Sequence, residues 1–352
     1  MINLKGKDML ATSDWTKSEL DQVLDLALKF KEMGAASRSL NLLKGKSLLL
    51  LWFAGSTRTW NSFYLAMQQL GGFVRSRDAK DMWVSLEEHP GAGTKESLKD
   101  TALVLDRYVD ALGIRLTTVT PEQVGGRTPR YGDAQAIFQQ FADYMKAPVI
   151  SMSSDMHHPT QSLTDLFTMK EKLGDVSGKK AVLLWTYNPK LSIIGSAQGY
   201  ALISATYGMD VTIACPKGYD QAVTMMPTIQ EECTKAGRKL EVSHDPKRAL
   251  EGADAVYPRN WSIRCHLDAE GREAEQRLAA QYKDWRLTEE LLKVTNNARF
   301  MHTMPFFRGY EVDASVADGP NSIIYDQAEN LLHVRKALLA SLMADSSLLE
   351  SI

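Results

Sequence analysis

The sequence predicts an α/β protein of two domains, each a doubly wound parallel β-sheet covered by helices. Short apolar runs alternate with segments of helical spacing through nearly all of its 352 residues, which is the pattern of parallel sheets with helices on both faces. A chain of this length exceeds the usual size of a single core. Polar turns follow several apolar runs, and open α/β sheets bind their ligands at the carboxyl ends of their strands.

The composition is that of an ordinary soluble globular protein, with 44% hydrophobic residues, 24% charged residues and a net charge of −2. Such a charge gives no global field for nucleic acid. No apolar run approaches the roughly 20 residues that span a bilayer, and the N-terminus lacks the apolar core of a secretory signal. We therefore expect a cytoplasmic protein with neither a nucleic-acid nor a membrane partner. Cys215, Cys233 and Cys265 show no close pairing and are expected to be reduced thiols.

The first half alternates regularly. Ser13 or Asp14 is the expected cap of the first helix. The predicted elements, in order, are a helix over 13–34, a strand from Leu48, a helix ending near Gly72, a helix over 95–109, a strand over 111–115, a helix over 133–145 and a strand before Asp155.

The turn Ser56-Thr57-Arg58-Thr59 joins the strand at Leu48 to its helix. Unpaired N–H groups and the positive dipole end at a helix start favour anions, and the hydroxyls and the guanidinium strengthen that preference. Phosphate is the ligand that we expect at this turn. The alternative is that Ser56 or Thr57 only caps the helix.

A polar stretch from Arg75 to Thr94 carries Trp83 and is expected to be a long loop. A Trp side chain is seldom left fully exposed to water. A ligand, a neighbouring subunit or the loop's own domain could bury the side chain of Trp83.

The cluster from Asp155 to Gln161 joins a strand to a helix, and includes His157 and His158. Adjacent histidines point in different directions and no further ligand is evident, so no metal is expected. His158 and Gln161 are instead suited to donate hydrogen bonds to a polarised carbonyl. Arg115, at the end of a short apolar run, is a second candidate for an anion.

The second half repeats the alternation. The predicted elements are strands over 179–187, 210–216, 239–243 and 253–257, helices over 196–207 and 222–237, a polar loop over 264–276, a helix ending near Leu292 and a closing helix over 327–343. Asn188 to Ser192, which includes Lys190, interrupts the expected passage from strand to helix.

Four ordered motifs resemble the aspartate and ornithine carbamoyltransferase family: residues 56–59, 113–115, 158–161 and 302–305. The resemblance covers nearly the whole chain, and segments such as GMDVTIACPKGYD and VTNNARFMH are most similar to the knotted N-acetylornithine branch. It implies a carbamoyl phosphate domain over 1–155 completed by 327–352, an acceptor domain over 156–326, a trefoil knot in the second domain, and a homotrimer with shared active sites.

The resemblance also implies the roles of individual residues, and no cofactor. The phosphate of carbamoyl phosphate would be bound by Ser56, Thr57, Arg58, Thr59 and Arg115. Trp83 would reach the site from a neighbouring subunit. The carbamoyl group of the same substrate would be contacted by His158, Gln161, Thr303 and Met304. Arg58, Thr59, His158, Gln161 and Thr303 would be catalytic, with Arg58, Thr59 and His158 stabilising an oxyanion. Lys190, Asn260, Trp261 and Glu311 would bind the acceptor.

Three positions depart from the family pattern. Trp60 stands where a second Arg is usual, Thr303 where a Cys is usual, and Leu331 where an Arg usually reaches carbamoyl phosphate. The lost Arg removes a charge that Arg308 or Arg335 would have to replace. These changes leave three expectations for function: transfer of a carbamoyl group to an N-acylornithine, transfer to ornithine or another amine, or non-catalytic binding of carbamoyl phosphate.

Overall fold

The computed structural model describes residues 2–79, 96–124, 126–190, 192–262 and 269–352. The chain divides into two compact units, the first comprising Met1–Leu163 and Asn330–Ile352 and the second Thr164–Glu329. Two helices, α5 (Pro159–Leu173) and α12 (Ile324–Met343), run from one unit into the other.

The sheet of the first unit has four parallel strands in the order β2-β1-β3-β4. These are β1 (Ser47–Trp52), β2 (Phe73–Asp78), β3 (Ala111–Arg115) and β4 (Val149–Ser153). The central strand β1 is buried from Leu48 onward, as a strand covered on both faces must be, which explains its unbroken apolar run.

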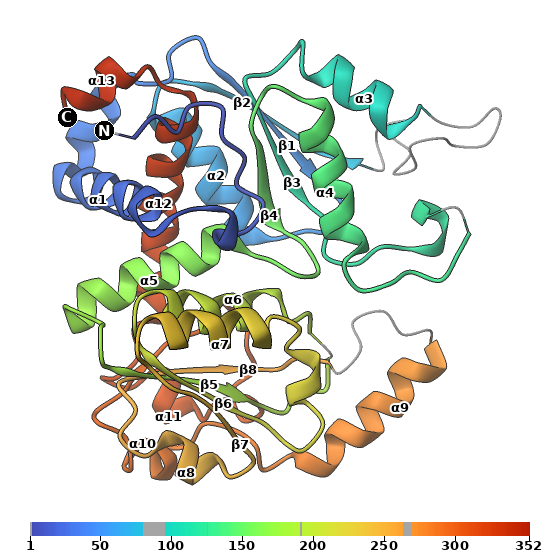
Figure 1. The fold of residues 1–352 in the computed structure, drawn as a ribbon, viewed down its shortest axis with the longest axis vertical. Helices are drawn as coiled ribbons and strands as arrows, with labels where there is room; N and C mark the ends of the chain where they lie inside the picture. The colour runs from blue at the N-terminus through green and yellow to red at the C-terminus, as the bar shows by residue number, and fades with distance from the viewer. Residues whose placement is uncertain (1, 80–95, 125, 191, 263–268) are drawn as a thin grey trace. The chain divides into compact units, whose positions relative to one another are not determined.

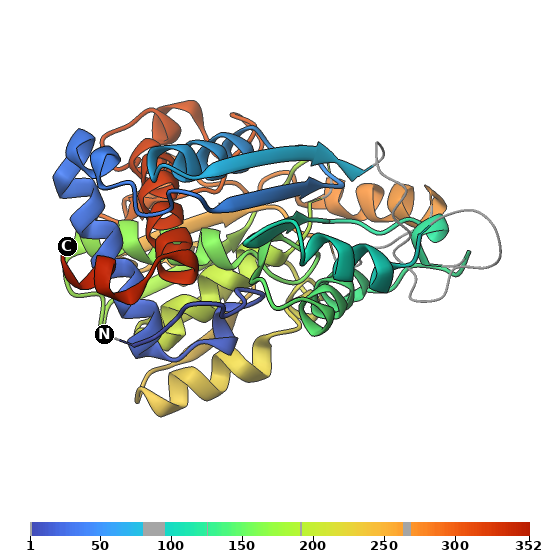
Figure 2. The same ribbon diagram turned by 90° about the horizontal axis from the view of Figure 1, so that it is seen from above.

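Helices α3 (Leu98–Leu105) and α4 (Asp133–Tyr144) pack together against this sheet (Figure 1) and share a core cluster with β1, β3 and β4. The remaining helices of the unit are α1 (Lys17–Met33), α2 (Thr57–Gln69) and the short α13 (Ser346–Glu350). The two ends of the chain meet in this unit (Figure 2), where the backbone N–H of Gly6 donates to the carbonyl of Leu342 at 3.0 Å.

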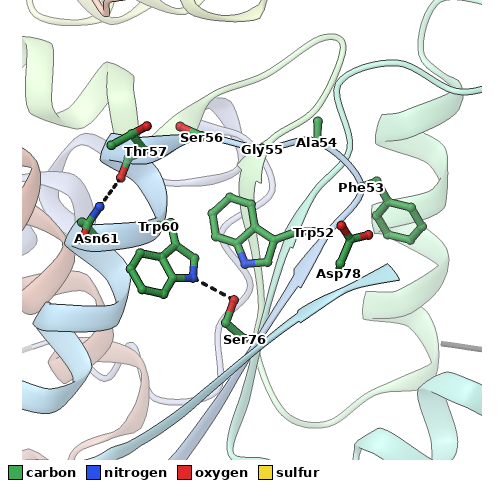
Figure 3. A pocket seen from close by; sticks show the side chains of 10 residues that line it. All are labelled: Trp52, Phe53, Ala54, Gly55, Ser56, Thr57, Trp60, Asn61, Ser76 and Asp78. Atoms are coloured by element: carbon green, nitrogen blue, oxygen red, sulfur yellow. Dashed lines mark hydrogen bonds between the residues drawn. The ribbon is translucent and has the colours of Figure 1, made fainter. Parts of the chain in front are cut away.

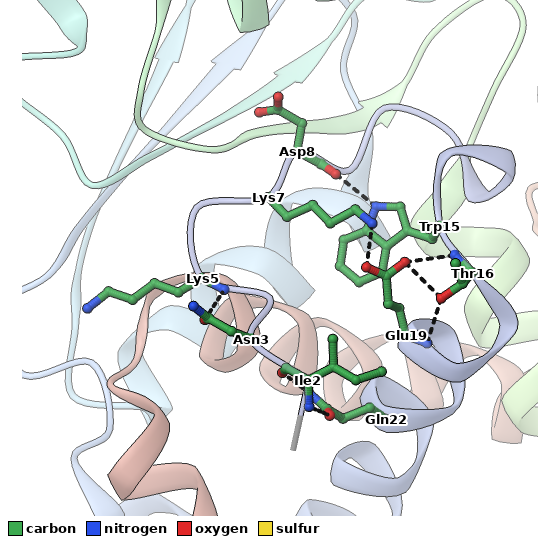
Figure 4. A network of polar contacts seen from close by, with 9 residues as sticks. All are labelled: Ile2, Asn3, Lys5, Lys7, Asp8, Trp15, Thr16, Glu19 and Gln22. Carbon is green, nitrogen blue, oxygen red and sulfur yellow. Dashed lines mark hydrogen bonds and ion pairs between the residues drawn. The ribbon is translucent and has the colours of Figure 1, made fainter.

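The predicted cap of the first helix is wrong. Thr16 is the cap, because its hydroxyl accepts from the backbone N–H of Glu19 while the Glu19 carboxylate accepts from Thr16. The same carboxylate pairs with Lys7 at 2.6 Å (Figure 4). Ser13 and Asp14 lie in a preceding 3-10 turn.

The strand β2 falls partly in the stretch that the sequence predicted as loop, so that prediction is wrong for Arg75 to Asp78. β2 is an edge strand, and only Val74 is buried along it. Its charged, exposed residues follow from its position, because edge strands carry charge that opposes pairing with other chains.

The second unit has a five-stranded parallel sheet in the order β7-β6-β5-β8-β9. The strands are β5 (Lys180–Trp185), β6 (Asp210–Ala214), β7 (Leu240–Ser243), β8 (Ala255–Arg259) and β9 (Arg299–Phe300). The helices are α6 (Gly195–Thr206), α7 (Met226–Lys235), α8 (Pro246–Leu250), α9 (Ala269–Ala279), α10 (Glu289–Leu292) and α11 (Ala314–Ala317).

The polar loop predicted over 264–276 is wrong for its second part, which forms α9. This helix is rich in charged residues and mostly exposed, and an i,i+4 pair between Glu273 and Arg277 at 3.5 Å supports it. The predicted α/β class with two parallel sheets is confirmed. In the described part of the chain, no helix is both long and apolar enough to cross a membrane.

Candidate active site

The turn after β1 leads into the first turn of α2, where the sequence predicts an anion site. Ser56 is the N-cap and its hydroxyl accepts from the backbone N–H of Thr59 at 3.4 Å. Ser56 also donates to the Thr59 hydroxyl at 3.0 Å. Thr59 is buried, Arg58 is half-buried and Thr57 is exposed. The cap and the anion site are therefore compatible uses of the same turn.

A cavity of about 460 Å³ opens at the carboxyl ends of β1 and β2 (Figure 3), within the usual size of a small-molecule site. Ser56 and Thr57 form part of its wall. The other lining residues are Trp52, Phe53, Ala54, Gly55, Trp60, Asn61, Ser76 and Asp78.

Trp60 occupies the place of the usual second Arg. Its ring stacks on Tyr64 with centroids 5.0 Å apart, and its indole N–H donates to Ser76 on the edge strand at 2.9 Å. Figure 3 shows it directed to the same wall as Ser76. The change at this place is thus a repacked contact between α2 and β2.

Arg115 ends β3, beside Trp52 of β1 in the strand register. The backbone N–H of Phe53 donates to the Arg115 carbonyl at 2.9 Å, and the Arg115 guanidinium donates to the Met152 carbonyl at 3.1 Å. The predicted second anion-binding residue therefore lies on the strand that neighbours the one leading into the Ser56 turn.

The loop after β4 uses Asp155 as a structural cap. Its carboxylate accepts from the backbone N–H groups of Gly132, Ala134 and Gln135 at 2.7 to 3.4 Å, which satisfies donors at the start of α4. Burial lowers the pKa of His157 to about 4, with the Asp155 charge opposing. His157 is therefore neutral near pH 7.

His158 and Gln161 lie at the start of α5, and both side chains are buried. They follow β4, two strands away from β1 in the order of the sheet. A buried imidazole and amide at a strand end can donate to a carbonyl oxygen with little competition from water.

Arg335 on α12 is fully buried and contacts the turn from Ser56 to Thr59. Its Nη1 points to the carbonyl oxygens of Arg58 and Thr59 at 3.4 and 3.5 Å, and its Nη2 to the Thr160 hydroxyl at 3.4 Å. Leu331, one turn earlier on α12, is also buried. Sequence reasoning named Arg335 only as a possible replacement, because a single Arg in an apolar helix gives no sign of what it faces.

In the second unit, His302 shapes the turn that carries Thr303 and Met304. The backbone N–H of Met304 donates to His302 Nδ1 at 2.7 Å, so the neutral ring carries its proton on Nε2. That nitrogen lies 3.6 Å from Glu311 Oε2, and both side chains are fully buried. Met304 has a φ of 51°, a left-handed conformation that few non-glycine residues adopt.

Glu311 is predicted to bind the acceptor, and the structure buries it among polar groups that the sequence did not indicate. Desolvation raises the pKa of Glu311, while the charge of Arg259 and a hydrogen bond from Asn188 lower it. Phe307 donates its backbone N–H at 3.4 Å. Asn188 and Arg259 come from the ends of β5 and β8, neighbours in the sheet.

The other predicted acceptor residues lie on the two segments after these strands. Asn260 donates to the Thr186 carbonyl at 3.0 Å and accepts from the Ser192 N–H at 3.2 Å. Trp261 is fully buried and donates to a backbone carbonyl at 3.0 Å. Lys190 is exposed, with its ammonium 5.6 Å from the centre of the Phe307 ring. Trp83 lies outside the described residues.

Cys215, Asp220 and His244 have donor atoms within 4.8 Å of one another in the second unit. Burial raises the pKa of the Cys215 thiol, and metals bind the thiolate. His244 Nδ1 lies 2.8 Å from the Cys215 carbonyl oxygen. This group therefore offers a poor metal site.

Comparison with known proteins gives two family matches that together span most of the chain. Residues 7–171 match the carbamoyl-P binding domain of aspartate/ornithine carbamoyltransferase, and residues 190–342 match its Asp/Orn binding domain.

Full-length relatives divide between two activities. The chain is 37% identical over 348 residues to an N-acetylornithine carbamoyltransferase of Xanthomonas campestris pv. campestris, covering 97% of this chain and 98% of the relative. It is 36% identical over 345 residues to an ornithine carbamoyltransferase of Halalkalibacterium halodurans, covering 97% of each.

Solved structures agree with these matches. An acetylornithine transcarbamylase complexed with acetylcitrulline superposes with a TM-score of 0.84 at 34% identity, covering 96% of this chain and all of that one. The ornithine carbamoyltransferase of Pyrococcus furiosus gives a TM-score of 0.80 at 32% identity, covering 97% of this chain and 99% of that one.

Proposed function

Because the chain belongs to the aspartate/ornithine carbamoyltransferase family, we propose that it transfers the carbamoyl group of carbamoyl phosphate to the amine of an N-acylornithine or a related amino acid. One observation carries the proposal for the donor. The turn from Ser56 to Thr59 places hydroxyls and an Arg at the start of α2, after the strand that pairs with the strand of Arg115.

In the proposed reaction, the neutral amine attacks the carbonyl carbon of carbamoyl phosphate. The new C–N bond forms, the C–O bond to phosphate breaks, and the amine loses a proton as phosphate leaves. Arg58 and Arg115 bind the phosphate oxygens through charge-assisted hydrogen bonds. Thr59 and His158 donate to the developing oxyanion, while Gln161, Thr303 and Met304 orient the carbamoyl group.

The acceptor assignment follows the N-acetylornithine relatives, which match through both halves of the chain. Glu311 is the main argument for the ornithine alternative. The N-acetylornithine enzymes carry a lysine at this place, whereas many ornithine enzymes carry an acid, as this chain does. A buried carboxylate at Glu311 with Arg259 beside it favours an acceptor that presents a hydrogen-bond donor there.

A non-catalytic carbamoyl phosphate binder is the competing function of another class. Leu331 and Trp60, which replace two arginines, are the observations that favour it. Trp60 has a hydrogen-bond partner in Ser76 and a stacking partner in Tyr64. Because the Trp60 side chain, although exposed, makes both of these contacts, we rank a working enzyme above a non-catalytic binder.

A panel of amines separates these functions. Phosphate release from carbamoyl phosphate is measured with N-acetylornithine, N-succinylornithine, ornithine and a set of other primary amines, and the ureido product is identified by mass. We expect one N-acylornithine to stimulate release most. A preference for ornithine supports the alternative acceptor, and binding of carbamoyl phosphate without release by any amine supports the non-catalytic function.

We also propose the homotrimer with shared active sites and the trefoil knot, which rest on the family resemblance. In support of the knot, the backbone N–H of Ser262 donates to the Ser192 carbonyl at 3.1 Å, so the loop after β5 is bound to the chain after β8. Both stay predictions.

A further inference from the structure

Arg335 is a fully buried cation with no carboxylate partner within the described part of the chain. Its guanidinium faces oxygen atoms that carry no charge. These are the carbonyl oxygens of Arg58 and Thr59, the Ser62 hydroxyl, to which Nη1 is hydrogen-bonded, and the Thr160 hydroxyl. It thereby touches the first turn of α2 and the first turn of α5 together.

The electrostatic surroundings make this burial costly. Desolvation, together with the positive charges of Arg115 and Arg58, lowers the pKa of Arg335 to about 9. The ring of Phe63, 4.5 Å from the guanidinium carbon, offsets part of the charge through its π-face. A buried charge without a counter-ion destabilises a fold.

The buried charge of Arg335 thus lies beside the turn that carries Arg58 and within the electrostatic influence of both Arg58 and Arg115. We propose that Arg335 is a positioning residue for the phosphate group of carbamoyl phosphate: it supplies positive potential to the Ser56 turn from α12 and fixes the starts of α2 and α5. This inference rests on the proposed phosphate site at Arg58 and Arg115. The phosphate dianion then neutralises a charge that the empty protein holds at a cost.

The chain contains a matched control in the next residue of α12. Lys336 is also a buried cation, and burial lowers its pKa to about 8. Its ammonium bonds to the Ser37 hydroxyl and lies 5.1 Å from the centre of the Phe30 ring. These contacts are with the segment around α1 and not with the phosphate turn. Removing Lys336 therefore removes a buried charge from the same helix without touching the proposed site.

The test titrates the full-length protein with carbamoyl phosphate, and separately with inorganic phosphate, by calorimetry. Arg335→Gln and Arg335→Met remove the charge, Arg335→Lys keeps it, and Lys336→Met is the control. We expect the two neutral variants to lose about tenfold in affinity for both ligands, because they remove positive potential from the turn at which the phosphate binds. Arg335→Lys should recover most of the loss, and Lys336→Met should bind as the wild type does.

Thermal unfolding of the empty proteins distinguishes positioning from a structural role. Because the charge is unsatisfied without ligand, Arg335→Gln should unfold at the wild-type temperature or above. An affinity within twofold of wild type in either neutral variant overturns the proposal. Failure of both neutral variants to fold also overturns it, because Arg335 would then be required for folding. Arg58→Ala, titrated in parallel, reports on the phosphate site itself: wild-type affinity in that variant, or no binding by the wild type, overturns the site and this inference with it.

Discussion

Arg58 lies in the first turn of α2, two residues after the Ser56 cap. Its backbone carbonyl faces Arg335, while its charge and that of Arg115 both act on Arg335. At the scale of single residues, the donor site is thus a set of cations around one helix start. The hydroxyls of Ser56 and Thr59 set the geometry of the turn, and the arginines set its preference for a dianion.

We expect Arg58→Ala to weaken carbamoyl phosphate binding by at least roughly tenfold, the loss of one charge-assisted hydrogen bond. Calorimetry measures the dissociation constant. Arg107→Ala serves as the control, because Arg107 is exposed and its guanidinium donates to the Leu103 carbonyl, one turn earlier in the chain. Equal affinity in the two variants would contradict the assignment of Arg58.

We expect Leu331→Arg to destabilise the protein by about 2 kcal/mol or more, since it buries a charge one turn from Arg335 on the same helix. Turnover should fall as well. The double variant Leu331→Arg, Arg335→Leu should regain stability, because only one cation then remains on this face of α12. Urea unfolding of both variants provides the measurement. A gain in stability, phosphate affinity and turnover by the single variant would show that the site is not repacked.

Among the structural elements, the starts of the helices are the parts of the candidate site that hydrogen bonds hold in place. Ser56 caps α2 and Asp155 supplies the acceptors for α4, so both loops are fixed by hydrogen bonds to backbone N–H groups. The sequence indicated no role for Asp155, since no metal was expected at its neighbouring histidines. Its contacts instead explain why an acidic residue follows β4.

Asp155→Ala should lower the free energy of unfolding by about 2 kcal/mol, since it leaves buried donors at the start of α4 without their acceptor. Asp143→Ala, on the exposed end of the same helix, should change it by less than about 0.5 kcal/mol. Chemical denaturation of the two variants compares them. Similar stabilities would show that the carboxylate of Asp155 does not hold this helix.

Elements with an apolar stripe or an apolar run could be predicted from sequence, and those without one could not. β1 and β5 read as continuous apolar runs because both faces are covered. β2 was missed because an edge strand carries charged residues, and α9 because its side chains are mostly exposed. The strand-end motifs could be placed because the ends of parallel strands meet at one edge of a sheet. The contacts of Arg335 and Glu311 could not, because they join residues far apart in sequence.

For the whole molecule, each unit presents a part of the predicted chemistry. The first unit holds the phosphate turn, Arg115, His158 and Gln161, and the second holds Thr303 and Glu311. The division between donor and acceptor chemistry follows the two family matches along the chain. The helices α5 and α12 each have residues in both units.

The proposed trimer predicts complementation between two inactive variants. If Trp83 serves the neighbouring subunit, trimers mixed from Arg58→Ala and Trp83→Ala chains contain some sites with both residues intact. Activity should then reappear on mixing, and mass measurement verifies that the trimers are mixed. Verified mixed trimers without activity would show that Trp83 acts within its own chain.

The most direct test of the central claim is the stoichiometry of transfer. Purified protein is incubated with carbamoyl phosphate and each amine of the panel, and phosphate and the ureido product are measured together. The proposed function predicts equal amounts of both products with an N-acylornithine or a related amino acid, and the loss of both in Arg58→Ala. Phosphate release that no amine stimulates, with no ureido product from any member of the panel, would contradict it.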